Sequence, residues 1–326
     1  MYLDKLIYLL NNEYPNAIEI TLIKQELEIS SNELNDLIDK AVQLELPIIE
    51  NENFLKLDYP LYSVHEIQSL MQNSFQNLVL LPEVDSTNKY AKEHLSSLEN
   101  QTAVLAYTQT AGVGRLQRNW QSPVGKSLSI SFVLKNLPDD LNLMPFSLLA
   151  AAALTKSLEP LTTNAKIKWP NDLILNDKKI TGILSEIEVD ENDNKHLIVG
   201  VGLNINQSHN EFSNDIEHKA TSLKLELEEW IIPSPLIARF IQEFFNQAEN
   251  YIQTNNSTPF IQYCKDQSAV IGKVVLAKSP RGNSTIVQVI DIDDSGRLIV
   301  KHPSSGKVET LLSHEVSIRQ PNGKYI

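Results

Sequence analysis

The stretch TQTAGVGRLQRNW, residues 108–120, places two glycines, two arginines and a tryptophan in one short segment after an apolar run. Glycines let backbone N–H groups approach a ligand closely, and the guanidinium groups of Arg115 and Arg118 can pair with carboxylate or phosphate oxygens. The segment therefore favours a loop that holds an anion. Taken alone, it is equally typical of a surface loop without a ligand.

Two familiar phosphate-binding motifs do not fit this part of the chain. Gly112 and Gly114 lack the third glycine of a dinucleotide fingerprint, and no helix is expected directly after them. Gly125 and the following Lys-Ser resemble the end of a P-loop, but Trp120 stands where the first glycine of that motif is required. An anion site here must draw on other segments.

Four further polar motifs lie in the central part of the chain: DSTN at 85–88, KWPND at 168–172, DKKITGIL at 177–184 and GVGLNIN at 200–206. Each has an ordinary structural interpretation. The first fits a helix cap, the second a turn, the third a hairpin tip beside a solvated lysine, and the fourth close packing of a buried strand. No single motif therefore indicates a function.

Composition limits the class of protein. The 326 residues are 42% hydrophobic and carry a formal charge of −13, which suits two or three globular domains and disfavours broad adhesion to nucleic acid. Cys264 is the single cysteine, which excludes an internal disulfide and a CxxC zinc site. The first residues lack the features of a signal peptide and no long apolar run follows, so we expect a cytoplasmic protein without a membrane partner.

The front of the chain predicts a small helical unit. Apolar spacing favours helices at 3–10 and around 21–28, and Ser30 with Glu33 forms a capping box that begins a third. Residues 48–57 then favour a hairpin. Three helices followed by a hairpin are typical of a winged helix-turn-helix.

The remainder of the chain mixes strands and helices before its pattern changes. Runs at 103–108 and 127–134 favour strands, and 146–158 favours a buried helix. The last part consists of short strands broken by turn sequences, which suits a small β-barrel. We expect an α+β protein with a winged helix at 1–62, a linker at 63–80, a mixed α/β domain at 81–271 and a small barrel at 272–326.

In this order and at this spacing, the five motifs resemble those of the biotin protein ligases, specifically the bifunctional type that also represses the biotin operon. The resemblance covers the whole chain and includes HEVSIR at 314–319. It implies a central mixed sheet related to class II aminoacyl-tRNA synthetases and an SH3-like C-terminal domain. It also implies a homodimeric enzyme that uses biotin, ATP and Mg²⁺ to form biotinoyl-5'-AMP and then biotinylates a lysine of a biotin carboxyl carrier domain.

The resemblance assigns roles to individual residues. Biotin is expected at Ser86, Thr87, Asn88, Gln109, Gly112, Val113, Gly114, Arg115 and Lys179. The nucleotide is expected at Arg118, Trp120, Lys168, Asn171 and Asn204. The expected catalytic residues are Lys179, Arg115, Arg118 and Asp172.

Electrostatics supports the role implied for Lys179. A carboxylate that attacks phosphorus brings two anions together, and a fixed cation lowers the energy of that crowded step. By the resemblance, Asp172 is also the expected magnesium ligand. Two positions depart from the family pattern: Val113 replaces the usual arginine, and His314 replaces the usual glycine.

Charge and resemblance disagree about DNA. Residues 1–60 contain four lysines against twelve carboxylates, a net charge of −8, whereas DNA binding usually depends on Lys and Arg contacts to phosphates. Operator contacts, if made, would come from Ser31, Asn32, Asn35, Lys40 and Lys56.

Two alternatives stay open. A lipoate or octanoate ligase has a similar catalytic domain, but that family lacks a winged helix at the front. The other alternative is a ligand-sensing repressor with little ligase activity. The presence of Arg115, Arg118 and Lys179 speaks against a catalytic domain that has lost its function. All five motifs lie beyond Leu81, so the sequence predicts that removal of residues 1–62 leaves adenylate formation largely intact.

Overall fold

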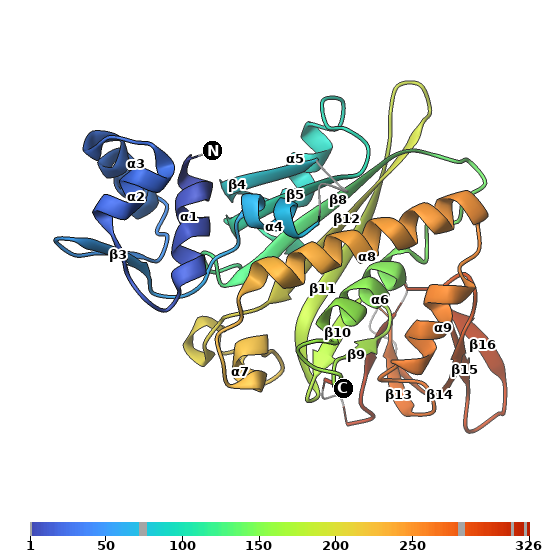
Figure 1. Cartoon of the computed structure of the whole chain (residues 1–326). Coiled ribbons are helices and arrows are strands. Elements are labelled where there is room, and N and C mark those ends of the chain that lie inside the picture. Colours follow the sequence, from blue (N-terminus) through green and yellow to red (C-terminus); the bar gives the residue numbers. More distant parts are fainter. Residues whose placement is uncertain (1, 72–76, 280–283, 314–315, 323–324) are drawn as a thin grey trace.

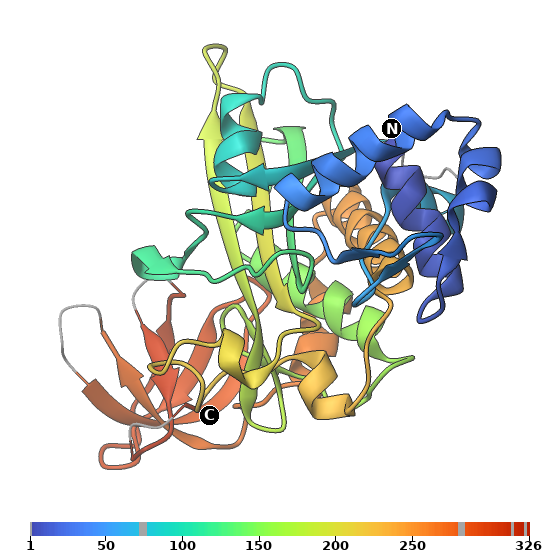
Figure 2. The same ribbon diagram turned by 90° about the vertical axis from the view of Figure 1, so that its left-hand side faces the viewer.

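The structure is a computed structural model that describes residues 2–71, 77–279, 284–313, 316–322 and 325–326. A central sheet occupies the middle of the molecule. Figure 1 and Figure 2 show the front unit, defined as residues 2–62, at one end of this sheet and a smaller C-terminal sheet at the other. Among the described helices, none is both long and apolar enough to span a membrane.

The front unit contains the expected helices and hairpin. Ser30 Oγ accepts a hydrogen bond from the Glu33 N–H, and the Glu33 carboxylate accepts one from the Ser30 N–H, which confirms the capping box. Strand β3 lies between β1 and β2 in an antiparallel sheet. The elements are α1 (Tyr2–Glu13), β1 (Ile18–Glu19), α2 (Ile20–Leu27), α3 (Ser31–Gln43), β2 (Ile48–Glu50) and β3 (Phe54–Leu57).

The segment expected as a linker, 63–80, is structured in its described part. Helix α4 (Val64–Leu70) begins where Ser63 Oγ accepts from the Glu66 N–H, and its Ile67 is fully buried. Strand β4 already begins at Leu78. The described part is therefore not a plain connection, because an apolar side chain within it joins the core. Residues 72–76 lie outside the described residues.

The central sheet has seven strands in the order β4-β5-β8-β12-β11-β10-β9. Only the β4–β5 pair is parallel. The runs predicted as strands at 103–108 and 127–134 are confirmed. In spatial order the strands are β4 (Leu78–Val84), β5 (Thr102–Gln109), β8 (Ser127–Leu137), β12 (Lys195–Asn204), β11 (Lys178–Val189), β10 (Asp172–Leu175) and β9 (Lys166–Lys168).

Each face of the sheet is covered differently, because successive side chains of a strand point to opposite faces. On one face, Val104 and Ile198 pack against Ala91 of α5. On the other, Phe132 stacks on Phe244 of the long helix α8, with ring centroids 3.9 Å apart. The helices of the central part are α5 (Thr87–Glu93), the buried α6 (Phe146–Leu158), α7 (Leu223–Leu227), α8 (Pro233–Thr254) and α9 (Thr258–Asp266).

The C-terminal sheet is antiparallel, with five strands in the order β16-β15-β14-β13-β17. Trp169 Nε1 donates to Gly296 O at 2.9 Å, which ties the KWPND motif to this sheet. The first two residues of the HEVSIR segment, His314 and Glu315, lie outside the described residues. The strands are β13 (Val274–Lys278), β14 (Ser284–Ile292), β15 (Leu298–Lys301), β16 (Val308–Leu311) and β17 (Ser317–Arg319).

The front unit packs directly on the central sheet. Leu61 is fully buried, and Tyr62 Oη donates to Ala106 O of β5 at 2.5 Å. Gly125 precedes β8 with φ of +63°, and a Cβ built there would lie 2.1 Å from Leu61 Cδ2. A residue without a side chain is therefore needed both for the backbone and for the contact with the front unit.

Gly125→Ala should lower the free energy of unfolding by about 2 kcal/mol or more, because it adds a left-handed backbone penalty to a clash with buried Leu61. Gly272→Ala is the matched control, since its φ is +80° but no atom lies within 4 Å of the added Cβ. Urea unfolding of both variants measures the difference. If both variants lost the same free energy of unfolding, the Leu61 side chain would make room for the added methyl group without an energetic penalty.

Candidate functional site

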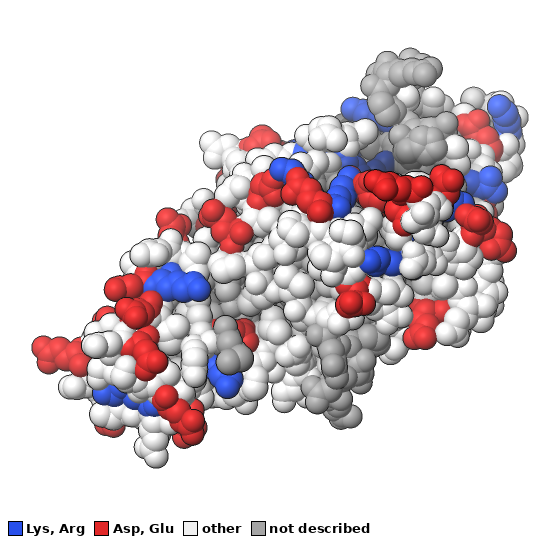
Figure 3. Space-filling view, turned by 90° about the horizontal axis from the view of Figure 1, so that it is seen from above, with Lys and Arg blue, Asp and Glu red and all other residues white. Residues whose placement is uncertain are grey.

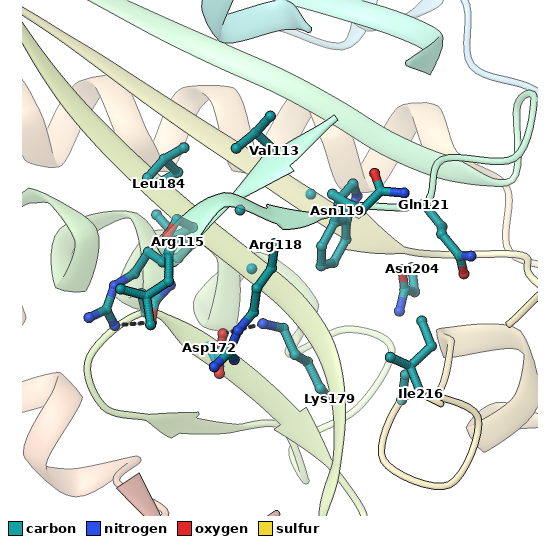
Figure 4. Close-up of a pocket in the computed structure, with 18 of the residues that line it drawn as sticks. Val113, Arg115, Arg118, Asn119, Gln121, Asp172, Lys179, Leu184, Asn204 and Ile216 are labelled. Carbon is teal, nitrogen blue, oxygen red and sulfur yellow. Dashed lines mark hydrogen bonds and ion pairs between the residues drawn. The ribbon is translucent and has the colours of Figure 1, made fainter. Parts of the chain in front are cut away.

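A cleft of about 690 Å³ opens on the α5 face of the central sheet. The loop 112–121 covers it, and within this loop β6 (Val113–Gly114) pairs with β7 (Arg118–Asn119). Figure 4 shows side chains from this loop, the sheet and the segment around Ile216 converging on the cleft. The lining includes these predicted ligand residues: Ser86, Thr87, Asn88, Gln109, Val113, Gly114, Arg115, Arg118, Trp120, Lys168, Asn171, Asp172, Lys179 and Asn204.

Gly112 is the predicted ligand residue that does not line the cleft. It is buried behind the loop, where a Cβ would lie 2.7 Å from Trp120 O. Its carbonyl stabilises the loop, because it accepts a hydrogen bond from the Trp120 N–H at 2.9 Å.

One end of the cleft is a network of polar side chains. Thr87 Oγ1 and its backbone N–H both donate to Gln109 Oε1, at 3.2 and 2.8 Å. Asn88 Nδ2 donates to Glu186 Oε2 at 2.7 Å, and Ser131 Oγ donates to Asn88 Oδ1 at 2.6 Å. Ser86 caps α5, as its ordinary interpretation required, and also lines the cleft. This end can match a small ligand group that carries both donors and an acceptor.

The cleft floor depends on glycines of β12 that share a face because they are two residues apart. A Cβ at Gly202 would lie 2.3 Å from Trp120 Cε2, and one at Gly200 would lie 2.3 Å from Asn88 Oδ1. The ordinary interpretation of GVGLNIN, close packing, is therefore correct, and the packing partners line the cleft. The Nε1 atom of Trp120 is buried without a hydrogen-bond partner.

The arginines of the loop reach the middle of the cleft. Arg115 donates to Asn171 Oδ1 at 2.9 Å and also to Ser313 O, so it links KWPND to the C-terminal part. Burial lowers the pKa of Arg115. Arg118 extends toward Asp172 and Lys179 in Figure 4. The loop therefore brings two guanidinium groups to one place, as its sequence predicted.

Asp172 is the centre of this cationic region. Lys179 Nζ lies 2.5 Å from Asp172 Oδ1, and Tyr325 Oη donates to Asp172 Oδ2 at 2.6 Å. Lys168 Nζ lies 3.8 Å from Asp172 Oδ2 and 3.4 Å from the centroid of the Tyr325 ring. The tip of the β10–β11 hairpin falls at residues 176–177, so Lys179 is not on the tip but in the cleft.

Burial and charge act in opposite directions on these groups. Burial by itself would raise the pKa of Asp172, but Lys179 and Lys168 overcome it and lower that pKa to about 2. Lys168 has a side chain only 2% exposed, and burial lowers its pKa to about 7 despite the neighbouring Asp172. Asp172 is therefore ionised at neutral pH, whereas Lys168 is poised between its charged and neutral forms.

Asp172 is the residue that the sequence predicts as a magnesium ligand. Both of its oxygens are engaged at hydrogen-bond distance, one by an ammonium group and one by a phenol. Among the described residues, no group of three His, Cys, Asp or Glu side chains could hold a metal ion. A magnesium ion at Asp172 would therefore share this carboxylate with Lys179 and Tyr325, and it would need ligands from the nucleotide phosphates. The role of Asp172 toward magnesium stays a prediction.

The segment 206–221 closes the other end of the cleft. Asn204, predicted to face the nucleotide base, lines this end, but its Nδ2 donates to Thr221 O at 2.9 Å and its Oδ1 accepts from Gln207 Nε2 at 3.0 Å. Gln207 Oε1 is buried without a hydrogen-bond partner. Gln207 Oε1 is thus an acceptor without a partner at this end, whereas the Asn204 amide is engaged by its neighbours, as the Asn88 amide is at the opposite end.

Sequence reasoning missed several residues of the cleft. Gln207 directly follows GVGLNIN and could have been considered with that motif. Arg319 is the last residue of the HEVSIR segment and could have been considered with it. Tyr325 could not, because it is distant in sequence from Asp172, which it approaches, and belongs to no recognised motif. The residues proposed for DNA are all exposed on the front unit and outside the cleft lining: Ser31, Asn32, Asn35, Lys40 and Lys56.

Comparisons with known proteins agree on one family. Residues 80–204 match the Biotin/lipoate A/B protein ligase family. The Bifunctional ligase/repressor BirA of Bacillus subtilis is 33% identical over 230 residues, which cover 69% of this chain and 70% of that protein. The Biotin--[acetyl-CoA-carboxylase] ligase of Mycobacterium tuberculosis is 31% identical, with 60% of this chain and 71% of that protein covered.

Solved structures give the same result for the fold. The biotin protein ligase from Aquifex aeolicus in complex with biotin and ATP superposes with a TM-score of 0.64 and is 27% identical, covering 76% of this chain and 100% of that one. The mixed seven-stranded sheet of this chain is thus similar to that of a biotin protein ligase.

The lowered pKa of Lys168 predicts a pH-dependent stability. Because the pKa is about 7 in the folded state and about 10.4 when unfolded, the unfolded chain binds more protons between these values, and stability rises with pH across this window. Relative to Lys168→Met, the wild-type free energy of unfolding should increase from about pH 7 to about pH 9, by up to about 1.4 kcal/mol per pH unit. Urea unfolding of both proteins at several pH values measures this increase. If the free energies of unfolding of the wild type and of Lys168→Met changed in parallel with pH, Lys168 would not be a buried lysine that titrates in this range.

Proposed function

This chain belongs to the biotin protein ligase family, and we propose that it forms biotinoyl-5'-AMP from biotin and ATP and then transfers the biotinoyl group to a lysine of a biotin carboxyl carrier domain. The observation that carries the proposal is the order of groups along one cleft. A polar network around Asn88 is followed by the cations around Asp172 and then by the segment that contains Gln207.

This order suits the two substrates. The polar network offers donors and acceptors for the ureido ring of biotin, whose polar atoms would otherwise be buried without partners. The cations in the middle suit the biotin carboxylate and the α-phosphate. The far end, with the free acceptor of Gln207, suits the adenine base.

Lys179 is the residue to which we assign the chemical step. Attack of the biotin carboxylate on the α-phosphorus forms a C–O–P anhydride and releases pyrophosphate. Two anions approach each other in this step, so a fixed ammonium group stabilises the transition state more than the separate substrates. Asp172 holds Lys179 Nζ at 2.5 Å and thereby fixes its position. No covalent bond to the enzyme is required.

Arg115 and the loop 112–121 are assigned to retention of the adenylate. Arg115 is anchored to Asn171 and to Ser313, so the loop is tied across the cleft. A closed loop keeps water and unrelated amines from the anhydride until the carrier lysine attacks. That attack forms an amide and releases AMP. The carrier and magnesium remain predictions that rest on the family resemblance.

Lys179→Ala should slow adenylate formation by about a hundredfold or more, because one positioned charge at the transition state is removed. The rate of pyrophosphate release with biotin and ATP measures this step. Lys178→Ala, at the neighbouring position of β11, is the matched control and should keep the wild-type rate. Normal turnover in Lys179→Ala would exclude the assigned role.

The substrate is tested in the same assay. Biotin should support pyrophosphate release, and lipoate and octanoate should not. Release with lipoate alone would replace the proposal by lipoate ligation, the alternative that the catalytic domain shares. Binding of biotin without release would instead favour a ligand-sensing repressor with little ligase activity.

A second function, repression of transcription, is favoured by the front unit and by relatives named bifunctional ligase/repressor. We propose that the front unit is a winged helix-turn-helix, with α3 as its recognition helix, and that residues 272–326 form an SH3-like domain. On the face seen in Figure 3, basic side chains lie among acidic ones at the end that carries the front unit. Because residues 1–60 carry four lysines against twelve carboxylates, we expect few phosphate contacts.

Weak operator binding with a shallow salt dependence is expected. A homodimer that contacts phosphates through Lys40 and Lys56 of each copy neutralises about four phosphates, which gives a slope of log K against log salt of about −3.6. Titration of promoter DNA at several salt concentrations, with biotin and ATP present, measures this slope. Tight binding to random DNA without ligand would contradict it.

A further inference from the structure

Lys126 connects the front unit with the segment that closes the far end of the cleft. Its Nζ lies 4.7 Å from the centroid of the Tyr59 ring and 2.7 Å from Glu211 Oε1. The side chains of this ion pair are only 19% and 21% exposed. Glu211 ends the short helix η2 (His209–Glu211), just before Phe212, which lines the cleft. The ring, the ammonium group and the carboxylate therefore form a chain from the front unit to the cleft wall.

A second contact joins the same ring to the same segment. Tyr59 stacks on Trp230 with centroids 5.7 Å apart and an interplanar angle of 9°. Lys224 Nζ lies 3.4 Å above the Trp230 ring and donates to Ser208 Oγ at 3.2 Å. Tyr59 is thus linked to Ser208 through Trp230 and Lys224, and to Glu211 through Lys126. Both ends of the short stretch 208–211 are therefore connected to this ring.

The segment in turn is joined to the reaction centre. The Asn206 N–H donates to Lys126 O at 2.7 Å. The next residue, Gln207, lies at the cleft. Further along, the Lys179 N–H donates to Lys219 O at 2.8 Å, and the Thr221 N–H donates to Lys179 O at 2.9 Å. The segment is therefore fixed at one end by Lys126 and at the other by the backbone of Lys179.

We propose that Tyr59 and Lys126 are positioning residues for the nucleotide: docking of the front unit holds segment 206–221 in the form that accepts the adenosine half of ATP. The inference rests on the proposed function and reverses the expectation, drawn from motif positions, that residues 1–62 are dispensable for adenylation. Because coupling is reciprocal, a bound nucleotide also stabilises the docked front unit.

Lys126→Met tests the proposal, because it removes the charge but keeps most of the side-chain volume. Loss of a partly buried, charge-assisted hydrogen bond should raise the KM for ATP about tenfold. The KM for biotin and the kcat should stay within about twofold, since the polar network and Lys179 are unchanged. Pyrophosphate release at varied ATP and varied biotin separates the three parameters.

Lys156→Met is a matched control. Lys156 Nζ also lies over a tyrosine ring, 5.3 Å from the centroid of Tyr263, and 4.0 Å from Glu243 Oε2. Neither Tyr263 nor Glu243 lines the cleft. Lys156→Met should therefore leave the KM for ATP at its wild-type value.

Two further variants locate the effect. Tyr59→Phe loses only the hydrogen bond from Tyr59 Oη to Val124 O and should keep the KM for ATP, whereas Tyr59→Ala should raise it as Lys126→Met does. In a double-mutant cycle, Glu211→Gln should add little to Lys126→Met, because both remove the same ion pair.

Reciprocity is tested by hydrogen exchange on the full-length protein. ATP should slow exchange of the backbone amides of Tyr59, Leu61 and Tyr62 in the wild type and much less in Lys126→Met. An unchanged KM for ATP in Lys126→Met, or a parallel change in kcat and both KM values, would overturn the proposal. Absence of pyrophosphate release from the wild type would instead refute the proposed function. The effect of ATP on hydrogen exchange in residues 59–62 would still show whether the nucleotide site and the front unit are coupled.

Discussion

The structure depends on one largely buried carboxylate, that of Asp172, whose side chain is 13% exposed. An ionised carboxylate away from water requires cations and donors close to it. Here they come from three directions: Lys168 from β9, Lys179 from β11 and Tyr325 from beyond the C-terminal sheet. Satisfying this single charge therefore fixes the edge of the central sheet, the hairpin after it and the position of the C-terminal part. The same requirement leaves ammonium groups beside open space, which is what a site for anionic ligands needs.

Much of the fold was predictable because it depends on patterns among residues that are close in sequence. Alternation and helical spacing located strands β5 and β8, helix α6 and the helices of the front unit, and the Ser30 capping box was correct to the residue. Strand β4 was not located, since it begins inside the segment expected as a linker. The cleft was predictable in outline, since each of its motifs has a characteristic composition. Gly112 was misplaced because a motif does not show which of its glycines face a ligand and which serve the loop.

What the sequence did not reveal depends on contacts between distant residues. Nothing in the order of residues relates Tyr325 to Asp172, or Tyr59 to Glu211 through Lys126. The segment 63–80 was expected to be a linker because residues 63–77 are mostly polar, whereas the buried Ile67 within it joins the core. The amide of Asn204 illustrates a further limit: composition shows which groups could bind a ligand, but not which have already been used by neighbours.

The docking of the front unit has a consequence for synthesis on the ribosome. The Ser63 N–H donates to Ser234 Oγ, a partner 171 residues later in the chain. At about 5–20 residues per second, the front unit leaves the ribosome roughly ten to thirty seconds before that partner exists. Leu61 and Tyr62 lack a cover for a shorter time, because Ala106 of β5 and Gly125 before β8 follow earlier in the chain. The newly made chain therefore exposes apolar side chains that the folded protein buries, and the docking of the front unit is completed only after most of the central part has been made.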